Sequence, residues 1–475
     1  MKITISFATE EFVTPEHDDV ILRLATILRQ RGITGSFHLT GDYARKLRER
    51  RRSDVITALR EHEIGYHGNT HGALPFLIGI CEERSWEDAV AALMATEARG
   101  IMDIADIFDR KPMYYVLEFV KAPQLIYALK GLGIDLLGFS GVPSSDNAPF
   151  SWYCGSLCFS APHMGLETPW APGRLQAFQK EFESLYAQAA AGAYDGVVKL
   201  FNHPYKFLYN NNIESWVSAN QLYRRSDIHL PWQIPRAGVY GREITGKLFA
   251  DFEQFLDYVQ GKPDVEFLST SALMKQYRRM PPKHISLEEV AQLTAAAAGD
   301  LNYQLSGGVY YSSAEIFGLL VYVLDAYAGG QALPDAAPYR DLLGPVEITP
   351  PVPNAVLTAP EILNAARRVN RELDFYRRLP TVIDVGGVKL PPGSFLAAGT
   401  ALLSQAMQSP TLLGWTWRAS TEALQMPRMA AHPYFAETTF TKASYPEGFT
   451  GRAVCAACRR QSWTYKPAVS ITSGK

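Results

Sequence analysis

Apolar residues recur with two different periods along roughly the first 275 residues of the chain. Short runs with alternating polarity predict strands, and apolar residues three and four positions apart predict helices. The predicted strands are 3–8, 34–40, 63–66, 135–139, 196–201 and 265–268. The predicted helices are 19–31, 43–62, 86–107, 123–132 and 248–260. This alternation predicts a parallel sheet, open or closed into a barrel, with the chemistry at the carboxyl ends of its strands.

The pattern changes at residues 278–283, Arg-Arg-Met-Pro-Pro-Lys, where we place a domain boundary. The predicted domains are 1–280 and 285–475, and the second is mainly helical. A helix, a turn with two glycines and a second helix occur twice in it. These two degenerate repeats span about 285–330 and about 357–405, around Gly307-Gly308 and Gly386-Gly387.

Composition narrows the classes of function. The 475 residues include 46 Lys and Arg and 48 Asp and Glu, a net charge of −2. This balance argues against a general binder of nucleic acid or anionic membranes. The longest apolar run, 316–324, is far shorter than the ~20 residues of a membrane span. Met1 leads directly into a strand pattern and not into a signal peptide, so a cytoplasmic location is the default expectation.

The strongest chemical signal is a pair of histidines directly after the strand 63–66. His67 and His71 stand four positions apart, a spacing that puts two imidazoles on one side of a helical turn. Neutral imidazole is a common ligand of zinc and similar metals. Two polar loop residues are the alternative, and the preceding strand and the loop glycines favour a metal site.

A hydrolytic metal site also needs a carboxylate and an open position for water. The first strand ends in Glu10-Glu11, which would share an edge with the histidines if the two strands are close. One carboxylate could then bind the metal while the other takes a proton from water. The alternative is a solvated acidic turn.

A third candidate is His203, which follows the apolar strand at 196–201 and precedes a proline. A histidine at a strand end can protonate a leaving amine or stabilise an oxyanion, although a structural role is the commoner one. The same tripeptide recurs at His432-Pro433-Tyr434 without a preceding strand, and we interpret that copy as structural.

Together these motifs resemble the polysaccharide deacetylase domain (NodB homology, carbohydrate esterase family four) over residues 1–275 or so. The resemblance rests on Glu10-Glu11, the run Gly32 to Gly41, Gly65-Tyr66-His67 to His71, and Leu200 to His203-Pro204. It implies a distorted barrel of seven strands and helices, and hydrolysis of an N- or O-acetyl group on a carbohydrate. It also implies a divalent metal, zinc above all, held by Glu11, His67 and His71, with Glu10 as base and His203 as acid.

The sequence departs from this family in two places. The acidic pair is Glu-Glu instead of Asp-Asp, and in another version of the motif Ala8 would occupy the base position and Glu10 the ligand position. Tyr115 stands where the family has an arginine, and the nearby cations Arg110 and Lys121 are out of register. We therefore treat Tyr115, and Trp152 as a possible wall, as candidate residues of a substrate pocket. The rival function is a non-catalytic carbohydrate-binding protein on the same scaffold.

The second domain resembles pseudomurein-binding repeats, most clearly in the segments 361–366 and 385–388. Such repeats imply a cell-wall glycan as partner; a helical accessory domain without that affinity is the alternative. Cys455 and Cys458 have metal-ligand spacing, but no second Cys or His pair follows, so a structural zinc is the less favoured interpretation of this pair. The sequence does not indicate an oligomeric state.

Overall fold

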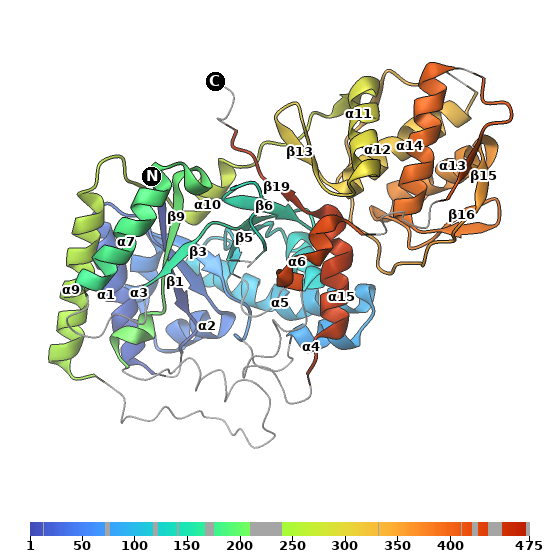
Figure 1. Cartoon of the computed structure of the whole chain (residues 1–475). Helices are drawn as coiled ribbons and strands as arrows, with labels where there is room; N and C mark the ends of the chain where they lie inside the picture. Colours follow the sequence, from blue (N-terminus) through green and yellow to red (C-terminus); the bar gives the residue numbers. More distant parts are fainter. Residues whose placement is uncertain are drawn as a thin grey trace. The chain divides into compact units, whose positions relative to one another are not determined.

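The chain forms two compact units in the computed structural model (Figure 1). The first unit contains residues 1–150, 157–277 and 437–451, and the second contains 151–156, 278–436 and 452–475. The structure describes residues 1–12, 14–71, 77–116, 122–139, 142–166, 175–209, 240–330, 332–409, 411–419, 426–435 and 449–471.

A curled parallel sheet forms the centre of the first unit (Figure 1). Its strands run in the order β7-β5-β4-β3-β2-β1-β9-β8, with β10 beside β1, and these neighbours pair in parallel. The strands are β1 Lys2–Thr9, β2 Ser36–Leu39, β3 Glu63–Tyr66, β4 Tyr115–Val116, β5 Leu136–Phe139, β7 Ser156–Phe159, β8 His163–Gly165, β9 Val197–Asn202 and β10 Glu266–Phe267. The predicted α/β fold of the distorted-barrel type is thus confirmed, in a curled half-barrel form.

Helices connect these strands and cover the outside of the curled sheet (Figure 1). They are α1 Glu16–Gln30, α2 Gly41–Glu49, α3 Ser53–Arg60, α4 Leu77–Glu83, α5 Trp86–Phe108, α6 Pro123–Gly131, α7 Leu175–Ala190, α9 Arg242–Gln260 and α10 Thr270–Lys275. Short 3-10 turns lie at η1 Ala193–Gly196 and η2 Pro204–Phe207. The stacked rings of Phe7 and Phe37 and the edge contact of Phe7 with Phe252 show one face of β1 and β2 packing against α9. Because side chains alternate along a strand, Ala8 and then Glu10 point to the opposite face, inside the curl.

The long helix predicted for 43–62 is wrong in one respect, because it is two helices, α2 and α3. The chain turns at Arg51, whose φ of 56° lies in the left-handed region. Arg50 and Arg52 on either side both reach the buried carboxylate of Asp18, at 3.1 and 3.7 Å. Tertiary ion pairs therefore accompany a break that helix periodicity alone does not reveal.

The second unit contains the same arrangement twice. A strand, a helix, a tight hairpin, a second helix and a strand follow one another, and the outer strands pair antiparallel. The first copy is β11 His284–Ser286, α11 Leu287–Gly299, β12 Gln304–Ser306, β13 Val309–Tyr311, α12 Ser313–Ala328 and β14 Ala336–Pro338. The second is β15 Val356–Thr358, α13 Ala359–Tyr376, β16 Ile383–Val385, β17 Val388–Leu390, α14 Pro392–Gln408 and β18 Thr416–Arg418.

Glycine turns at the same place explain why the hairpins of the two copies are alike, and a capping box begins one helix of each copy. Gly307-Gly308 and Gly386-Gly387 all have positive φ, as the two central residues of a tight β-hairpin turn require. Ser312 before α12 and Thr358 before α13 each begin a capping box with a glutamate three residues on. The helices bury one continuous apolar cluster. The mainly helical second part is confirmed as part of the fold class.

The end of the chain belongs to the second unit. β6 Phe150–Tyr153 pairs antiparallel with β19 Lys466–Pro467, and α15 Arg452–Gln461 carries the buried Cys455 and Cys458. The remaining 3-10 turns are η4 Arg428–Ala431, η5 Pro433–Phe435 and η7 Ser462–Thr464. His432 lies between two of these turns, where its Nδ1 accepts a hydrogen bond from the Tyr434 amide at 3.1 Å.

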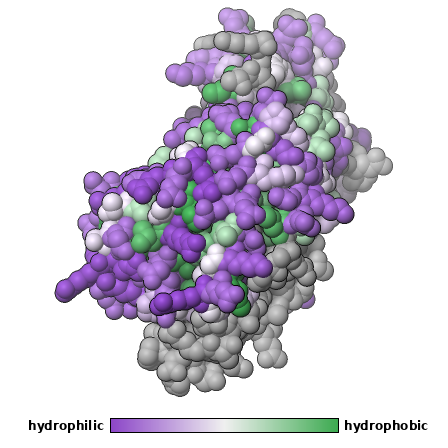
Figure 2. Space-filling model, turned by 90° about the vertical axis from the view of Figure 1, so that its left-hand side faces the viewer, coloured by the Kyte–Doolittle hydropathy of each residue, from purple (hydrophilic) through white to green (hydrophobic). Residues whose placement is uncertain are grey.

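Hydrophobic residues are distributed unevenly over the described helices and the surface. No helix in the described ranges has the length and apolar composition needed to cross a bilayer. Figure 2 shows a face on which hydrophilic side chains predominate and the hydrophobic ones form small separate spots. This is the surface expected where amphipathic helices turn their apolar stripe toward a sheet.

Candidate metal centre

Four neighbouring strands of the first unit end at one edge of the sheet, and three of them lead into candidate site residues. In the order β3-β2-β1-β9, Leu39 pairs with Tyr66 and Phe7 with Asn202, so the strands finish at similar heights. Glu10 follows β1, His67 follows β3 and His203 follows β9. Because the strands are parallel, all three side chains are delivered to the carboxyl edge, where α/β folds place their chemistry.

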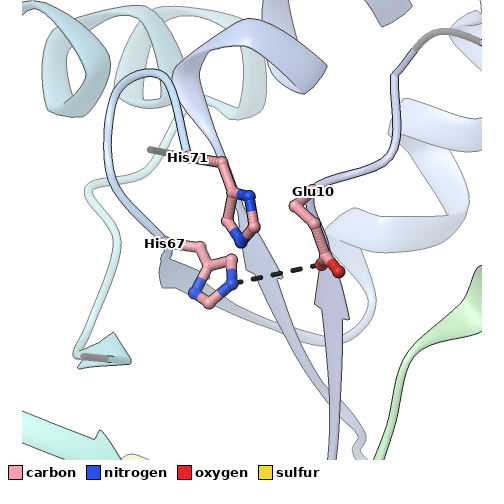
Figure 3. Close-up of side chains that lie close together, drawn as sticks. All are labelled: Glu10, His67 and His71. Atoms are coloured by element: carbon pink, nitrogen blue, oxygen red, sulfur yellow. Dashed lines mark ion pairs between the residues drawn. The ribbon is translucent and has the colours of Figure 1, made fainter. Parts of the chain in front are cut away.

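Glu10, His67 and His71 gather at this edge (Figure 3). One potential ligand atom from each residue lies within 4.8 Å of the others. Nε2 of His67 is 4.0 Å from a carboxylate oxygen of Glu10, and the two imidazole centroids are 4.8 Å apart. All three side chains are buried, with at most 4% of their surface exposed. In Figure 3 both rings, carried by the loop after β3, lie beside the Glu10 carboxylate at the end of β1.

The electrostatic environment keeps His67 in the form that binds metals. Burial lowers the pKa of His67 well below its usual value, and the charges of His71 and His203 lower it further. His67 is therefore a neutral imidazole near pH 7, with a lone pair available. Two imidazoles and one carboxylate are a common three-residue ligand set of catalytic zinc sites, which keep a fourth position for water. The donor set thus fits a divalent metal in kind and number.

His203 adds a fourth titratable group to this edge. Its Nε2 lies 3.4 Å from the other carboxylate oxygen of Glu10. The ring packs between Phe201 and Tyr205, with centroids at 4.9 and 5.4 Å, and 8% of the residue is exposed. A histidine held between aromatic rings and pointing at a ligand carboxylate is placed to exchange a proton with a molecule at the centre.

Glu11, expected from the family resemblance as the metal ligand, is not brought to the histidines. One of its carboxylate oxygens accepts a hydrogen bond from the Thr14 amide at 2.9 Å, and the other lies 3.8 Å from Nδ1 of His17. Adjacent side chains at the end of a strand face opposite sides, so only one of the two glutamates can face the pair. The structure brings Glu10 there, which agrees with the second version of the motif, with Ala8 in the base position.

The two candidate pocket residues lie elsewhere. Tyr115 is buried beside Tyr66, with ring centroids 5.6 Å apart. The Tyr66 hydroxyl donates a hydrogen bond to Glu97 on α5, outside the sheet, so both rings lie on that side. Trp152 belongs to the second unit, where the Arg278 guanidinium lies over its ring at 5.7 Å. Neither side chain is part of the cluster at the carboxyl edge.

The cations near the missing motif arginine do not replace it. Arg110 donates to the carbonyl oxygen of His62 at 3.0 Å, just before β3 begins, and therefore lies at the opposite end of that strand. Lys121 lies outside the described residues.

Sequence reasoning missed three buried residues inside the curled sheet: His38, Tyr114 and Lys199. His38 on β2 lies 6.1 Å from His67 and 5.2 Å from Tyr114, measured between ring centroids. Lys199 on β9 donates to the Gly138 carbonyl at 2.8 Å, and burial lowers its pKa to about 7. A lysine inside the apolar run Val-Val-Lys-Leu-Phe was the available signal, because charged residues are almost never fully buried unless paired.

The sequence itself matches no protein-family model and no curated protein. Several solved structures are similar over part of the chain. A protein assigned as a polysaccharide deacetylase from Mycobacterium smegmatis has 16% identity and a TM-score of 0.37, over 59% of this chain and 94% of that one. A family 4 acetyl xylan esterase from Clostridium thermocellum, solved with a cobalt ion, has 13% identity and a TM-score of 0.28, over 58% and 91%.

A 4-alpha-glucanotransferase from Thermococcus litoralis is structurally at least as similar to this chain as these two proteins are. It has 13% identity and a TM-score of 0.38, over 62% of this chain and 43% of that one. Likenesses at this level do not assign the chain to a family.

Proposed function

We propose that the first unit is a metal-dependent hydrolase that removes an acetyl group from an acetylated carbohydrate. The observation that carries this proposal is the buried cluster of Glu10, His67 and His71 with His203 beside it, at the carboxyl edge of a parallel sheet. The ordered motifs of the sequence, which resemble polysaccharide deacetylases, supply the reaction class. The ligand set proposed is Glu10, His67 and His71, with Glu10 in place of Glu11.

A divalent metal at this position would polarise the acyl carbonyl and lower the pKa of a bound water. The chain's own residues supply proton transfer. With Glu10 engaged as a ligand and Ala8 in the base position, the described titratable group placed for this task is His203. We assign both steps to it: His203 takes a proton from the attacking water and returns it to the departing amine or alcohol. The 3.4 Å contact with Glu10 would stabilise the imidazolium between the two steps.

A second candidate function is binding of a glycan without hydrolysis. It is favoured by the apolar Ala8 at the family's base position and by Tyr115, which faces away from the centre. In this alternative the repeats of the second unit would add affinity for a cell-wall glycan. The two candidates make opposite predictions for acetate release by a metal-loaded protein.

The test compares metal content and acetate release in matched variants. We expect the wild type to hold about one divalent metal per chain. Glu10→Ala, and the double change His67→Ala with His71→Ala, should lose it, because each removes a ligand. Glu11→Ala is the matched control and should keep the metal. Mass spectrometric metal analysis and acetate release from N-acetylated oligosaccharides are the measurements.

Each outcome has a definite meaning. A wild type that holds no more metal than the histidine double variant contradicts the metal centre. Loss of metal in Glu11→Ala, but not in Glu10→Ala, would restore the first version of the motif. Metal binding without acetate release favours the binding protein. His203→Gln should lower kcat about 100-fold or more while leaving metal content unchanged.

A further inference from the structure

The loop that carries both histidines forms hydrogen bonds at its midpoint with Glu97, Asp42 and Arg45. Asn69 lies between His67 and His71, and its amide donates to a carboxylate oxygen of Glu97 at 3.1 Å. Its carbonyl oxygen accepts from the Asp42 amide at 3.0 Å, and its side-chain oxygen accepts from Arg45 at 3.0 Å. Helices α2 and α5 therefore hold the loop from two sides.

Glu97 connects this loop to the strand from which it emerges. Only 1% of the residue is exposed, on α5, and the oxygen that accepts from Asn69 also accepts from the Tyr66 hydroxyl at 2.7 Å. Tyr66 is the last residue of β3. Burial raises the pKa of Glu97 to about 7. Burying the ionised carboxylate at this place therefore costs free energy of folding. One carboxylate oxygen of Glu97 thus accepts hydrogen bonds from both the end of the strand and the middle of the loop.

The backbone of the loop needs such support. His71 has a φ of 37°, in the left-handed region that residues other than glycine avoid at a cost of about 1–2 kcal/mol. Gly68 has a φ of 85°. A conformation of this kind persists only where the surroundings impose it. In this conformation the His71 ring lies with its centroid 4.8 Å from that of His67.

Gly100 shows that α5 is shaped for this contact. A Cβ atom there would lie 2.6 Å from the Tyr66 hydroxyl and 2.9 Å from Cα of Asn69. Glycine in the middle of a helix costs about 1 kcal/mol relative to alanine. The glycine is thus locally unfavourable, and the close approach of the histidine loop accounts for it.

We propose that Glu97 and Asn69 are positioning residues of the candidate metal centre, which hold His67 and His71 in the ligand geometry before a metal arrives. This inference rests on the proposed metal centre. Preorganised ligands bind more tightly, because the free energy of ordering the loop is not drawn from metal binding. Removing groups that orient metal ligands lowers metal affinity about 10- to 100-fold.

The experiment is a titration of the metal-free full chain with Co²⁺, followed by its visible absorption. Glu97→Ala should weaken Co²⁺ binding about 10- to 100-fold and change the absorption bands, because the ligand geometry changes. Glu97→Gln should restore binding to within about threefold, since one amide oxygen can accept both hydrogen bonds. The matched control is Glu87→Ala, an exposed residue of the same helix, which should bind as the wild type does.

The outcomes separate this inference from the proposed function. Wild-type affinity and an unchanged spectrum in Glu97→Ala overturn the inference and leave the metal centre standing. An equal loss of Co²⁺ affinity in Glu97→Gln and Glu97→Ala also overturns it, because the glutamine amide oxygen could still accept the hydrogen bonds that position the loop. A wild type that binds no Co²⁺ overturns both. If Glu97→Ala does not fold, Tyr66→Phe and Asn69→Ala replace it, and unweakened binding by both overturns the inference.

Discussion

At the scale of single residues, Glu10 and Glu11 show how strand geometry divides two adjacent side chains. Glu10 continues the face of β1 that carries Ala8 and meets the histidines, whereas Glu11 turns to Thr14 and His17. Both are 1% exposed, so burial does not distinguish them. The period of two along a strand does, because it places Glu10 and Glu11 on opposite faces.

Lys199 leads to a prediction about pH. Its pKa is lowered by burial from 10.5 to about 7, so between these values the unfolded chain binds more protons than the folded one. Stability must therefore rise with pH over this interval, by at most about 1.4 kcal/mol per pH unit. Below pH 7 both states are protonated, and the penalty for a buried charge is fully present.

The measurement is urea unfolding of the metal-free chain at pH 7 and pH 9. Wild type should gain roughly 2 kcal/mol over this interval relative to Lys199→Met, which has no group to titrate. The methionine variant removes the buried charge at similar volume. If the free energy of unfolding changed with pH equally in the two proteins, burial would not lower the pKa of Lys199, and the prediction would be wrong.

At the scale of elements, the two copies in the second unit are set by short local signals. Each hairpin has a pair of glycines with positive φ, and a capping box begins the second helix of the first copy, α12, and the first helix of the second copy, α13. These features are visible in the sequence, because the residue types that a tight turn and a helix start require are few. The paired outer strands of three residues each were not predicted, because such short segments carry almost no periodicity.

The hairpin glycines give a prediction with an internal control. Gly387 has a φ of 88°, and a Cβ atom there would meet no described atom within 4 Å, so Gly387→Ala tests backbone conformation alone. We expect a loss of about 1–2 kcal/mol in the free energy of unfolding. Gly299, the last residue of α11, also has open space but no positive φ.

Gly299→Ala should therefore be neutral or stabilising by up to about 1 kcal/mol. Denaturant unfolding of both variants is the measurement. Equal effects of the two changes would contradict the turn argument.

At the scale of the whole molecule, the second unit is completed by residues far along the chain. The Lys466 ammonium lies 2.7 and 2.9 Å from the two carboxylate oxygens of Glu315, and 4% or less of either residue is exposed. The same carboxylate accepts from the Tyr339 hydroxyl and the Ser312 amide. Trp463, three residues earlier, is fully buried in the apolar cluster of the unit. The final segment is thus an integral part of this fold.

Breaking this buried ion pair should be strongly destabilising. Lys466→Met leaves the Glu315 charge buried without its cation, and removing one partner of such a pair costs about 3–5 kcal/mol. The matched control is Lys389→Met, which breaks an exposed pair with Asp384 and should have little effect on stability. Hydrogen exchange of the α12 amides reports on this unit. Comparable protection in both variants would contradict the role assigned to the pair.

The sequence by itself determined the alternation of strands and helices, the change of pattern near residue 280, the doubled glycine hairpin and the candidate residues His67, His71 and His203 with an acidic pair at Glu10-Glu11. These depend on local periods and on residue types whose geometry is restricted. Only the tertiary structure decided that Glu10 and not Glu11 meets His67 and His71, and that Glu97 holds their loop. It also decided that Tyr115 faces outward and that Trp463 and Lys466 complete the second unit. Such facts depend on which residues distant in the chain approach one another, and a pattern read along the chain contains no information on distance in space.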